Sequence, residues 1–355
     1  MSVEASPAAP SFPSRVYATL LGGALGDSLG YAVEFDTIGV IRARFGPAGL
    51  TSFEQLDGDT HISDDTQMTL YTVDGLVEAL EWANDGVAAD ELACLWLAYL
   101  RWLATQDVAV SASAPVPQPR WIDRQEVLRH RRAPGNTCLS ALASGEMGTV
   151  ARPLNPESKG CGTVMRSAPF GLIPHISLEA VNKLSTDAAT LTHGHPSARL
   201  SAAAFSLLVH HLVTGKDIRG AATEALHYVN GLPTKAPELP ERLEAALRLS
   251  SAPTVLSPEE LTAALGEGWV AEEALAVGLY AVLATQGGDP ADHFRRAIGV
   301  AVNHSGDSDS TGSIAGNILG AYYGEACLPS DWLAALEGVD VIRGMADRLL
   351  AVTTA

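Results

Sequence analysis

The sequence has few cysteines and no long apolar run. Its four cysteines are widely spaced and include no Cys-x-x-Cys pair: Cys94, Cys138, Cys161 and Cys327. This spacing argues against a disulfide framework or a zinc site and favours a reducing cytoplasm. No apolar stretch reaches the ~18–20 residues of a membrane-spanning helix, and the N-terminus does not resemble a signal peptide. We therefore expect a cytoplasmic protein with no membrane partner.

Positive charge is scarce as well. The chain of 355 residues carries 23 Lys and Arg against 41 Asp and Glu, a net charge of −18. Such a balance disfavours nucleic acid as a partner, because nucleic acid requires a basic surface. Bound divalent ions, helix N-termini and a few arginines can still create a local anion site. Apolar residues make up 47% of the chain, which is typical of a globular protein.

Alternating strand patterns are nearly absent, whereas helical periodicity recurs. One-sided apolar patterns predict helices over 66–80, 196–214 and 311–324, and glycines four residues apart in the last of these allow another backbone to approach closely. Residues 108–119 and 233–240 are Pro-rich connections, and residues 1–13 form a flexible leader. We predict an all-α fold, a compact single domain over 14–355.

Two acidic motifs stand at predicted helix starts. The first is Ser63-Asp64-Asp65 and the second is Asp307-Ser308-Asp309-Ser310. Each on its own is explained as a helix cap, because Ser and Asp are preferred there. The second is not an EF-hand, since no Glu follows at the required position.

Taken together, the two motifs offer four carboxylates and two hydroxyls. All-oxygen ligands suit Mg²⁺ or Mn²⁺ rather than zinc, and carboxylates can bridge two such ions in hydrolytic sites. Asp65 and Asp307 lie 242 positions apart in the chain. A shared metal site therefore depends on the fold, and both the cap and the ligand interpretations stay open.

Three further segments carry candidate residues. Asp27 and Glu34 lie in a glycine-rich apolar run, where an isolated buried acid is costly. The loop Lys159–Arg166 could turn backbone N–H groups towards phosphate, although it lacks the order of a P-loop. In that loop, we favour a packing thiol over a nucleophile for Cys161, because no activating base is evident. His193 precedes a predicted helix and is either structural or a ligand contact.

These motifs, in this order, resemble the ADP-ribosylglycohydrolase family. The resemblance rests on Gly26-Asp27 with Glu34, on Ser63–Thr66, on Gly160–Arg166, on Thr192-His193 and on Gly306–Ser310, and it extends from about residue 17 to about residue 325. Gly266–Trp269 and Ala271–Leu275 resemble the bacterial branch. Each piece is weak, but the combination is specific.

The resemblance implies an all-α fold with a cleft that holds two Mg²⁺ or Mn²⁺ ions. The implied metal ligands are Ser63, Asp64, Asp65, Asp307, Asp309 and Ser310. The implied or candidate substrate contacts are Asp27, Gly160, Cys161, Gly162, Thr163, His193 and Trp269. The Trp269 ring would stack near an adenine or, equally well, pack in the core.

The implied reaction removes ADP-ribose from a modified side chain, most plausibly arginine, by cleaving the bond at the anomeric carbon of the distal ribose. This bond breaks through oxocarbenium character, as in other glycoside hydrolyses. Asp65 or Asp309 would accept a proton from water, and Glu34 would position the substrate or gate the site. The substrate would be an ADP-ribosylated protein or small molecule.

Two other functions stay open. The chain could be a catalytically dispensable binding or immunity protein that occludes an ADP-ribosyltransferase. It could also be a metal-dependent phosphohydrolase acting on a nucleotide diphosphate, because all-oxygen two-metal sites serve that chemistry too.

Overall fold

The structure, a computed structural model, describes residues 9–58 and 60–354 and is helical there, without a strand. The only strand-like pairing in these ranges is an isolated bridge between Gly160 and Val270. The all-α prediction is therefore confirmed. The α-helices are α1 Phe12–Tyr31, α2 Ile38–Phe45, α3 Asp64–Asn84, α4 Glu91–Leu103, α5 Asn136–Ala143, α6 Leu178–Thr190, α7 Pro196–Val213, α8 Ile218–Gly231, α9 Glu238–Leu249, α10 Pro258–Leu265, α11 Ala271–Ala284, α12 Pro290–Val302, α13 Ser308–Tyr323, α14 Ser330–Ala335 and α15 Val339–Thr353.

The first and thirteenth helices pack closely at the centre of the molecule. A Cβ added at Gly26 would lie 2.0 Å from the Gly312 carbonyl oxygen, and one at Gly316 would lie 1.9 Å from that of Gly22. Only glycine fits such an approach of two backbones. The contact predicted from the glycine spacing is thus confirmed, and α1 is the partner helix.

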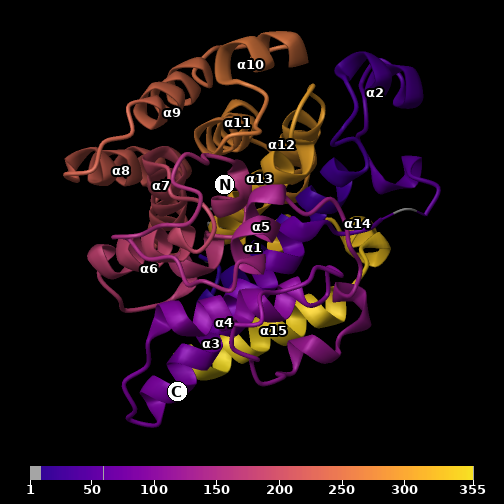
Figure 1. The fold of residues 1–355 in the computed structure, drawn as a ribbon. Helices are drawn as coiled ribbons and strands as arrows, with labels where there is room; N and C mark the ends of the chain where they lie inside the picture. The colour runs from indigo at the N-terminus through magenta and orange to yellow at the C-terminus, as the bar shows by residue number, and fades with distance from the viewer. Residues whose placement is uncertain (1–8, 59, 355) are drawn as a thin grey trace.

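The remaining helices surround this pair. In Figure 1, α3, α4 and α15 lie at one end of the molecule and α8, α9 and α10 at the other, with α1 and α13 between them. One apolar core runs through the described residues and includes Leu25, Tyr71, Phe205, Tyr280 and Ile314, all buried. None of the described helices combines the length and the hydropathy needed to cross a membrane.

Several local predictions can be compared directly with the structure. The helices predicted over 66–80, 196–214 and 311–324 correspond to α3, α7 and α13. Residues 108–119 contain no helix, as expected, and all four cysteines are free.

Two predicted boundaries need correction. Phe12 and Pro13, expected in the leader, begin α1, because Ser11 accepts a hydrogen bond from the Ser14 N–H as its N-cap and proline suits the first turn. Residues 1–8 of the leader lie outside the described part of the chain. The 233–240 connection ends at Pro237, because Pro240 is accommodated in the first turn of α9.

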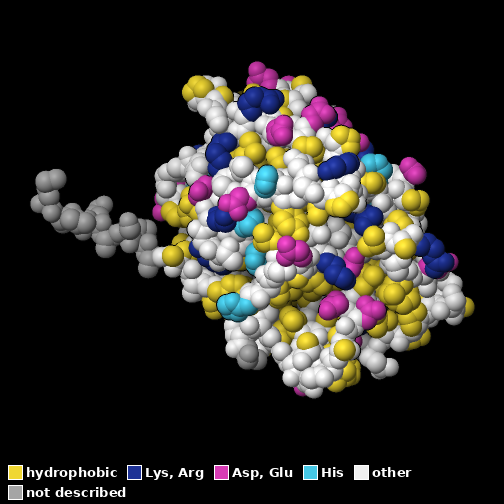
Figure 2. Space-filling view, turned by 90° about the vertical axis from the view of Figure 1, so that its left-hand side faces the viewer, with side chains coloured by type: hydrophobic (Ala, Val, Ile, Leu, Met, Phe, Trp, Pro, Cys, Tyr) yellow, Lys and Arg dark blue, Asp and Glu magenta, His cyan; other side chains and the backbone are white. Residues whose placement is uncertain are grey.

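The surface shows no concentration of positive charge on the face drawn in Figure 2. There, Lys and Arg side chains are scattered among acidic, apolar and uncharged polar groups.

Candidate active site

The first acidic motif lies at the N-terminus of α3. Ser63 is the N-cap, and its hydroxyl accepts a hydrogen bond from the Asp65 N–H at 3.2 Å. Asp64 and Asp65 follow in the first turn, where the helix dipole favours negative charge. The cap interpretation is therefore confirmed for Ser63, and it leaves both carboxylates free for other roles.

The second motif is arranged in the same way at the N-terminus of α13. Asp307 is the N-cap and accepts a hydrogen bond from the Ser310 N–H at 3.3 Å. The Asp307 N–H donates to the Glu267 carbonyl at 2.9 Å, which fixes the start of the helix to the segment before α11.

The two helix starts meet at a cavity of about 190 Å³. Eleven of the predicted residues line it: Glu34, Asp64, Asp65, Gly160, Cys161, Gly162, His193, Trp269, Asp307, Asp309 and Ser310. Larger hollows exist elsewhere, such as one of about 650 Å³ beside residues 110–119, but they lack this group of carboxylates. The fold thus brings together motifs that are far apart in the sequence.

Three predicted site residues do not line the cavity. Ser63 is fully buried beneath the α3 turn and lies beside Asp309, where its hydroxyl opposes part of the rise that burial causes in the pKa of Asp309. The predicted substrate contacts Asp27 and Thr163 need correction. Thr163 is buried, and its hydroxyl donates to the Ala198 carbonyl at 2.9 Å.

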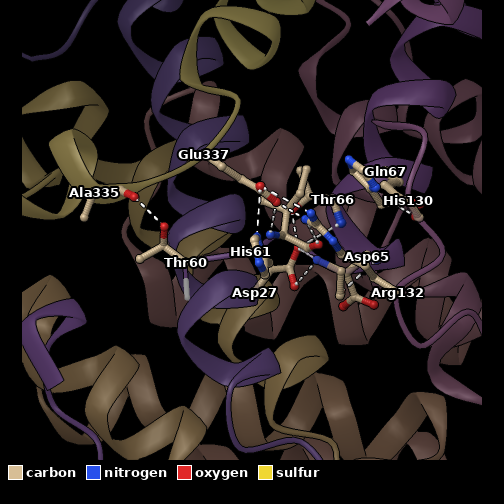
Figure 3. A network of polar contacts seen from close by, with 12 residues as sticks. Asp27, Thr60, His61, Asp65, Thr66, Gln67, His130, Arg132, Ala335 and Glu337 are labelled. Carbon is tan, nitrogen blue, oxygen red and sulfur yellow. Dashed lines mark hydrogen bonds and ion pairs between the residues drawn. The ribbon is translucent and has the colours of Figure 1, made fainter. Parts of the chain in front are cut away.

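Asp27 supports the first motif from behind. Its carboxylate accepts hydrogen bonds from the Ser63 N–H at 3.0 and 3.1 Å and from the Thr66 N–H at 3.2 Å, and it also accepts one from the Thr66 hydroxyl. The side chain is fully buried. Figure 3 shows Asp27 and Thr66 close to Asp65. Asp27 therefore fixes the start of α3 instead of facing a ligand.

The carboxylates of the cavity are buried. Glu34, Asp64, Asp65, Asp307 and Asp309 are each at most 7% exposed. Burial raises the pKa of every one of them, and the negative charge of Asp309 raises those of Glu34, Asp64 and Asp65 further.

The basic side chains near the cavity pair with groups other than its carboxylates. Lys159 pairs with Glu272 at 2.6 Å, and Arg132 pairs with Glu337. Arg166 donates to the Thr192 hydroxyl at 2.7 Å and packs over the Tyr99 ring. In the described part of the chain, no ion pair includes a carboxylate of the cavity.

These donors fit divalent metal ions by their chemistry. Buried charges in proteins are paired or bound to metals, and here five carboxylates lack a positive partner. Asp65 Oδ2 and Glu34 Oε2 are buried with no hydrogen-bond partner at all. Within the described residues, no three His, Cys, Asp or Glu side chains already converge on one point as a formed metal site. The fit therefore rests on donor type, burial and missing partners.

A glycine turn forms the opposite wall. Residues Cys161–Thr163 make one turn of 3₁₀ helix. A Cβ at Gly162 would lie 2.9 Å from His193 Cε1, and one at Gly160 would lie 3.2 Å from His193 Nε2. Glycine thus lets the imidazole lie against the turn. Burial, followed by the charge of Arg166, lowers the pKa of His193 to about 3, so the ring is neutral.

Cys161 is held as a thiol in this turn. Its Sγ lies 2.7 Å from Asp307 Oδ2, and burial together with the Asp307 charge raises the pKa of the thiol well above its usual value. A neutral thiol is a poor nucleophile, which agrees with the packing interpretation. The Cys161 N–H donates to the Trp269 carbonyl at 3.2 Å and is therefore not available to a ligand.

Trp269 is not a core residue. Its ring is 39% exposed and stacks against Phe35, which is 74% exposed, with centroids 6.2 Å apart and planes 20° apart. The alternative of a packed core tryptophan is therefore excluded. Phe35 was not predicted as a site residue, although a large aromatic residue directly after a candidate acid was a usable signal.

A further wall of the cavity was not predicted from the sequence. It is formed by Ala133, Gly135, Thr137 and Cys138. The Gly135 N–H donates to Asp64 Oδ2 at 3.3 Å, and Ala133 has a positive φ of 49°. The Pro-Gly pair at 134–135 is a strong turn signal, but nothing in the sequence indicates that this turn contacts Asp64.

Comparisons with known proteins identify the family of the chain. The family model described as ADP-ribosylglycohydrolase matches residues 8–355. The chain is 26% identical to the ADP-ribosyl-[dinitrogen reductase] glycohydrolase of Rhodospirillum rubrum, over 97% of this chain and 98% of that protein.

Other similar proteins match part of the chain or its fold. Identity is 31% to the ADP-ribosylhydrolase ARH3 of Danio rerio, over 59% of this chain and 63% of that one. It is 26% to the ADP-ribosylarginine hydrolase Tri1 of Serratia proteamaculans, over 55% and 47%. A solved ADP-ribosylglycohydrolase-related protein complex shares the fold, with a TM-score of 0.63 and 24% identity, over 97% of this chain and 99% of that chain. The chain belongs to the ADP-ribosylglycohydrolase family.

Proposed function

We propose that this protein is a metal-dependent hydrolase that releases ADP-ribose from modified arginine side chains. The observation that carries the proposal is the cavity in which five buried carboxylates from three segments form no ion pair with a described basic side chain and face a glycine turn. Family membership supplies the substrate class. Arginine is supported by the similar protein whose name specifies ADP-ribosylarginine.

Two Mg²⁺ or Mn²⁺ ions would be held by Asp64, Asp65, Asp307, Asp309 and Ser310, which line the cavity, together with the Ser63 hydroxyl, which lies behind them beside Asp309. Ions of this kind supply positive charge and Lewis acidity to a hydrolytic site. Their charge would also offset the burial of the carboxylates, whose pKa values are raised without it.

The protein's own residues would bind and orient the substrate. Asp65 Oδ2 has no hydrogen-bond partner, which leaves it free to accept a proton from an attacking water; Asp309 is the other candidate. Glu34 would position the distal ribose or close the cavity over it, since its Oε2 is also without a partner. The cavity of about 190 Å³ suits that ribose rather than the whole nucleotide.

The rest of ADP-ribose would extend along the glycine turn towards the rim. The diphosphate would lie beside this turn, whose glycines Gly160 and Gly162 pack against the neutral His193 ring. Trp269, together with Phe35, offers an exposed aromatic surface for a planar base. Exposed aromatic rings at a cavity rim are typical of ligand contacts.

The test measures release of ADP-ribose from ADP-ribosylated arginine by wild type, Asp64→Ala and Asp309→Ala. We expect roughly 100-fold or greater loss in both variants, because loss of outer-shell partners alone costs about 10–100-fold. EDTA should abolish activity and Mn²⁺ should restore it. Asp331→Ala, on exposed α14, is the control and should keep wild-type activity.

Full activity of both variants and of the EDTA-treated wild type would overturn the two-metal proposal. Product analysis separates the chemistry, because AMP with ribose phosphate would mean diphosphate cleavage. Turnover of serine-linked but not arginine-linked ADP-ribose would overturn the acceptor alone. Tight binding to an ADP-ribosyltransferase that persists in Asp64→Ala would favour the occlusion function.

A further inference from the structure

The segment that leads to Ser63 has no secondary structure of its own. Residues 60–63 are not helical and lead directly into α3, which begins at Asp64. Buried backbone groups need hydrogen-bond partners, and no strand is available to supply them here. The partners come instead from side chains and loops that are distant in the sequence.

Three different parts of the protein hold this segment. Asp27 of α1 accepts from the Ser63 N–H, as described above. The Arg132 carbonyl accepts from the Asp64 N–H at 3.2 Å. On the other side, the Thr60 hydroxyl donates to the Ala335 carbonyl at 2.6 Å.

Glu337 also contacts the 60–63 segment, and it connects the segment to Arg132. Its Oε1 accepts from the Ile62 N–H at 2.8 Å, and its Oε2 lies 3.1 Å from His61 Nδ1. Arg132 forms an ion pair with the same carboxylate and donates to the Ile62 carbonyl at 3.0 Å. Figure 3 shows Glu337 and Arg132 converging on His61 beside Asp27 and Asp65.

The side chains of this pair are largely withdrawn from water. Arg132 is 11% and Glu337 21% exposed at the side chain. Burial lowers the pKa of Arg132, because its charge has lost hydration, and Glu337 is the carboxylate that forms an ion pair with it. A pair of this kind holds its partners more firmly than an exposed one.

Glu337 reaches the segment from the far end of the chain. It lies in the turn between α14 and α15, 275 positions after Ile62. The next residue, Gly338, has a φ of 70° and is the N-cap of α15. The docking of the C-terminal helix against α3 thereby determines where Glu337 meets the metal-ligand segment.

We propose that Glu337, acting through Arg132 and the Ile62 backbone, is a positioning residue for the Ser63-Asp64 metal ligands. The inference rests on the proposed metal centre. Neither side chain lines the cavity, so both act on the ligands by fixing the backbone that carries them. Outer-shell residues of this kind typically alter metal affinity about 10–100-fold when removed.

The experiment measures Mn²⁺ affinity directly, from the electron paramagnetic resonance signal of free Mn²⁺ titrated with full-length protein. We expect Glu337→Ala to weaken Mn²⁺ binding by about 10–100-fold. Glu337→Gln should weaken it less, because the amide oxygen still accepts from Ile62. Arg132→Lys keeps the charge but loses the two-pronged contact, and it should weaken binding as well.

The matched control is Glu325→Ala. Glu325 forms an ion pair with Arg343 of α15 at 3.0 Å, so it too connects the C-terminal helix to the body of the protein, away from the cavity. This variant should bind Mn²⁺ like the wild type. Unfolding midpoints in EDTA should be similar for Glu325→Ala and Glu337→Gln, and raising Mn²⁺ should restore the hydrolysis lost in Glu337→Gln.

Wild-type Mn²⁺ affinity in Glu337→Gln and Arg132→Lys, with only a lower unfolding midpoint, would overturn the positioning role and leave the proposed function intact. Equal weakening in Glu325→Ala would also overturn it, because the effect would then be general loosening. Failure of the wild type to bind Mn²⁺ would overturn the metal centre itself and this inference with it.

Discussion

At the scale of single residues, one acid in the first helix and one just after it, Asp27 and Glu34, show what a sequence can and cannot specify. Asp27 and Glu34 both lie in an apolar run, where an isolated acid is costly, so both were expected to have partners. The structure separates them. Asp27 accepts hydrogen bonds from Ser63 and Thr66, whereas Glu34 Oε2 faces the cavity without one. The spacing of the two acids in the sequence could not reveal this difference. The difference depends on where the start of α3 lies relative to each acid in the folded protein.

The bond between Thr66 and Asp27 gives a prediction at this scale. Thr66→Val removes a buried hydroxyl that donates to a carboxylate, and a hydrogen bond to a charged group contributes about 1.5–3 kcal/mol. Thr72→Val is the control on the same helix, because the Thr72 hydroxyl bonds only to the neutral Met68 carbonyl and Tyr99 hydroxyl. Urea unfolding should show the greater loss for Thr66→Val. Equal losses would contradict the assigned role of Asp27.

At the scale of helices, the two helix starts explain why caps and metal ligands are hard to tell apart. Ser63 and Asp307 do act as caps, which is the ordinary role of such residues. The residues that follow each cap, in the first turn of the helix, include Asp64, Asp65 and Asp309. These three side chains line the cavity. The same local signal therefore serves both roles, and only the meeting of two helix starts distinguishes them.

The contact between α1 and α13 gives a prediction for a pair of helices. Alanine normally stabilises a helix interior by about 0.5–1 kcal/mol relative to glycine. Gly299→Ala in α12 should do so, because nothing lies within 4 Å of its added Cβ. Gly316→Ala should instead destabilise by about 1–3 kcal/mol or more, because its Cβ would meet the Gly22 carbonyl, which is backbone and cannot rotate away.

Two measurements check this comparison. Thermal unfolding should move in opposite directions for Gly316→Ala and Gly299→Ala. Hydrolysis should fall only in Gly316→Ala, because forcing α13 away from α1 also moves Asp309 away from the α3 start. Stabilisation by both substitutions would show that the two helices can separate freely.

At the scale of the whole molecule, the sequence predicted the all-α fold and most of the cavity-lining residues, but not how they meet. The helical periodicities and the motif order were sufficient for those predictions. The wall at 133–138 and the Glu337 contact were not predictable, because each depends on a loop docking against a helix start far away in the chain. Phe35 was missed for a different reason, since an exposed aromatic residue has no periodic pattern.

The buried carboxylates give a prediction for the whole protein, which concerns stability without metal. Burial, together with the charge of Asp309, raises the pKa of Asp27 to about 7, and those of Asp64, Asp65 and Asp309 lie well above their usual value. A raised carboxyl pKa means that the folded state binds protons more tightly than the unfolded chain. The stability from such a group is complete below about pH 4 and is lost as pH rises through the folded pKa.

The carboxylates determine how stability changes with pH between about pH 7 and about pH 8.5. Below about pH 6.5 the buried histidines act in the opposite direction, since burial lowers the pKa of His193 and His304 and protonation in the unfolded state costs stability. Above about pH 8.5 the cysteines begin to contribute. Within the window, each titrating carboxyl should lower the free energy of unfolding in EDTA by up to about 1.4 kcal/mol per pH unit.

Excess Mn²⁺ should reverse this trend, because ionised carboxylates are the ligands and metal binding competes with protons. Asp309→Asn removes one titrating group and the charge that raises the others. In EDTA at about pH 8.5 it should therefore be more stable than the wild type, although it no longer binds metal well. Urea unfolding of both proteins in EDTA and in Mn²⁺ tests the argument. A free energy of unfolding of the wild type in EDTA that stays constant between about pH 7 and about pH 8.5 would contradict this prediction. The carboxylates would then not form a charged group that needs cations.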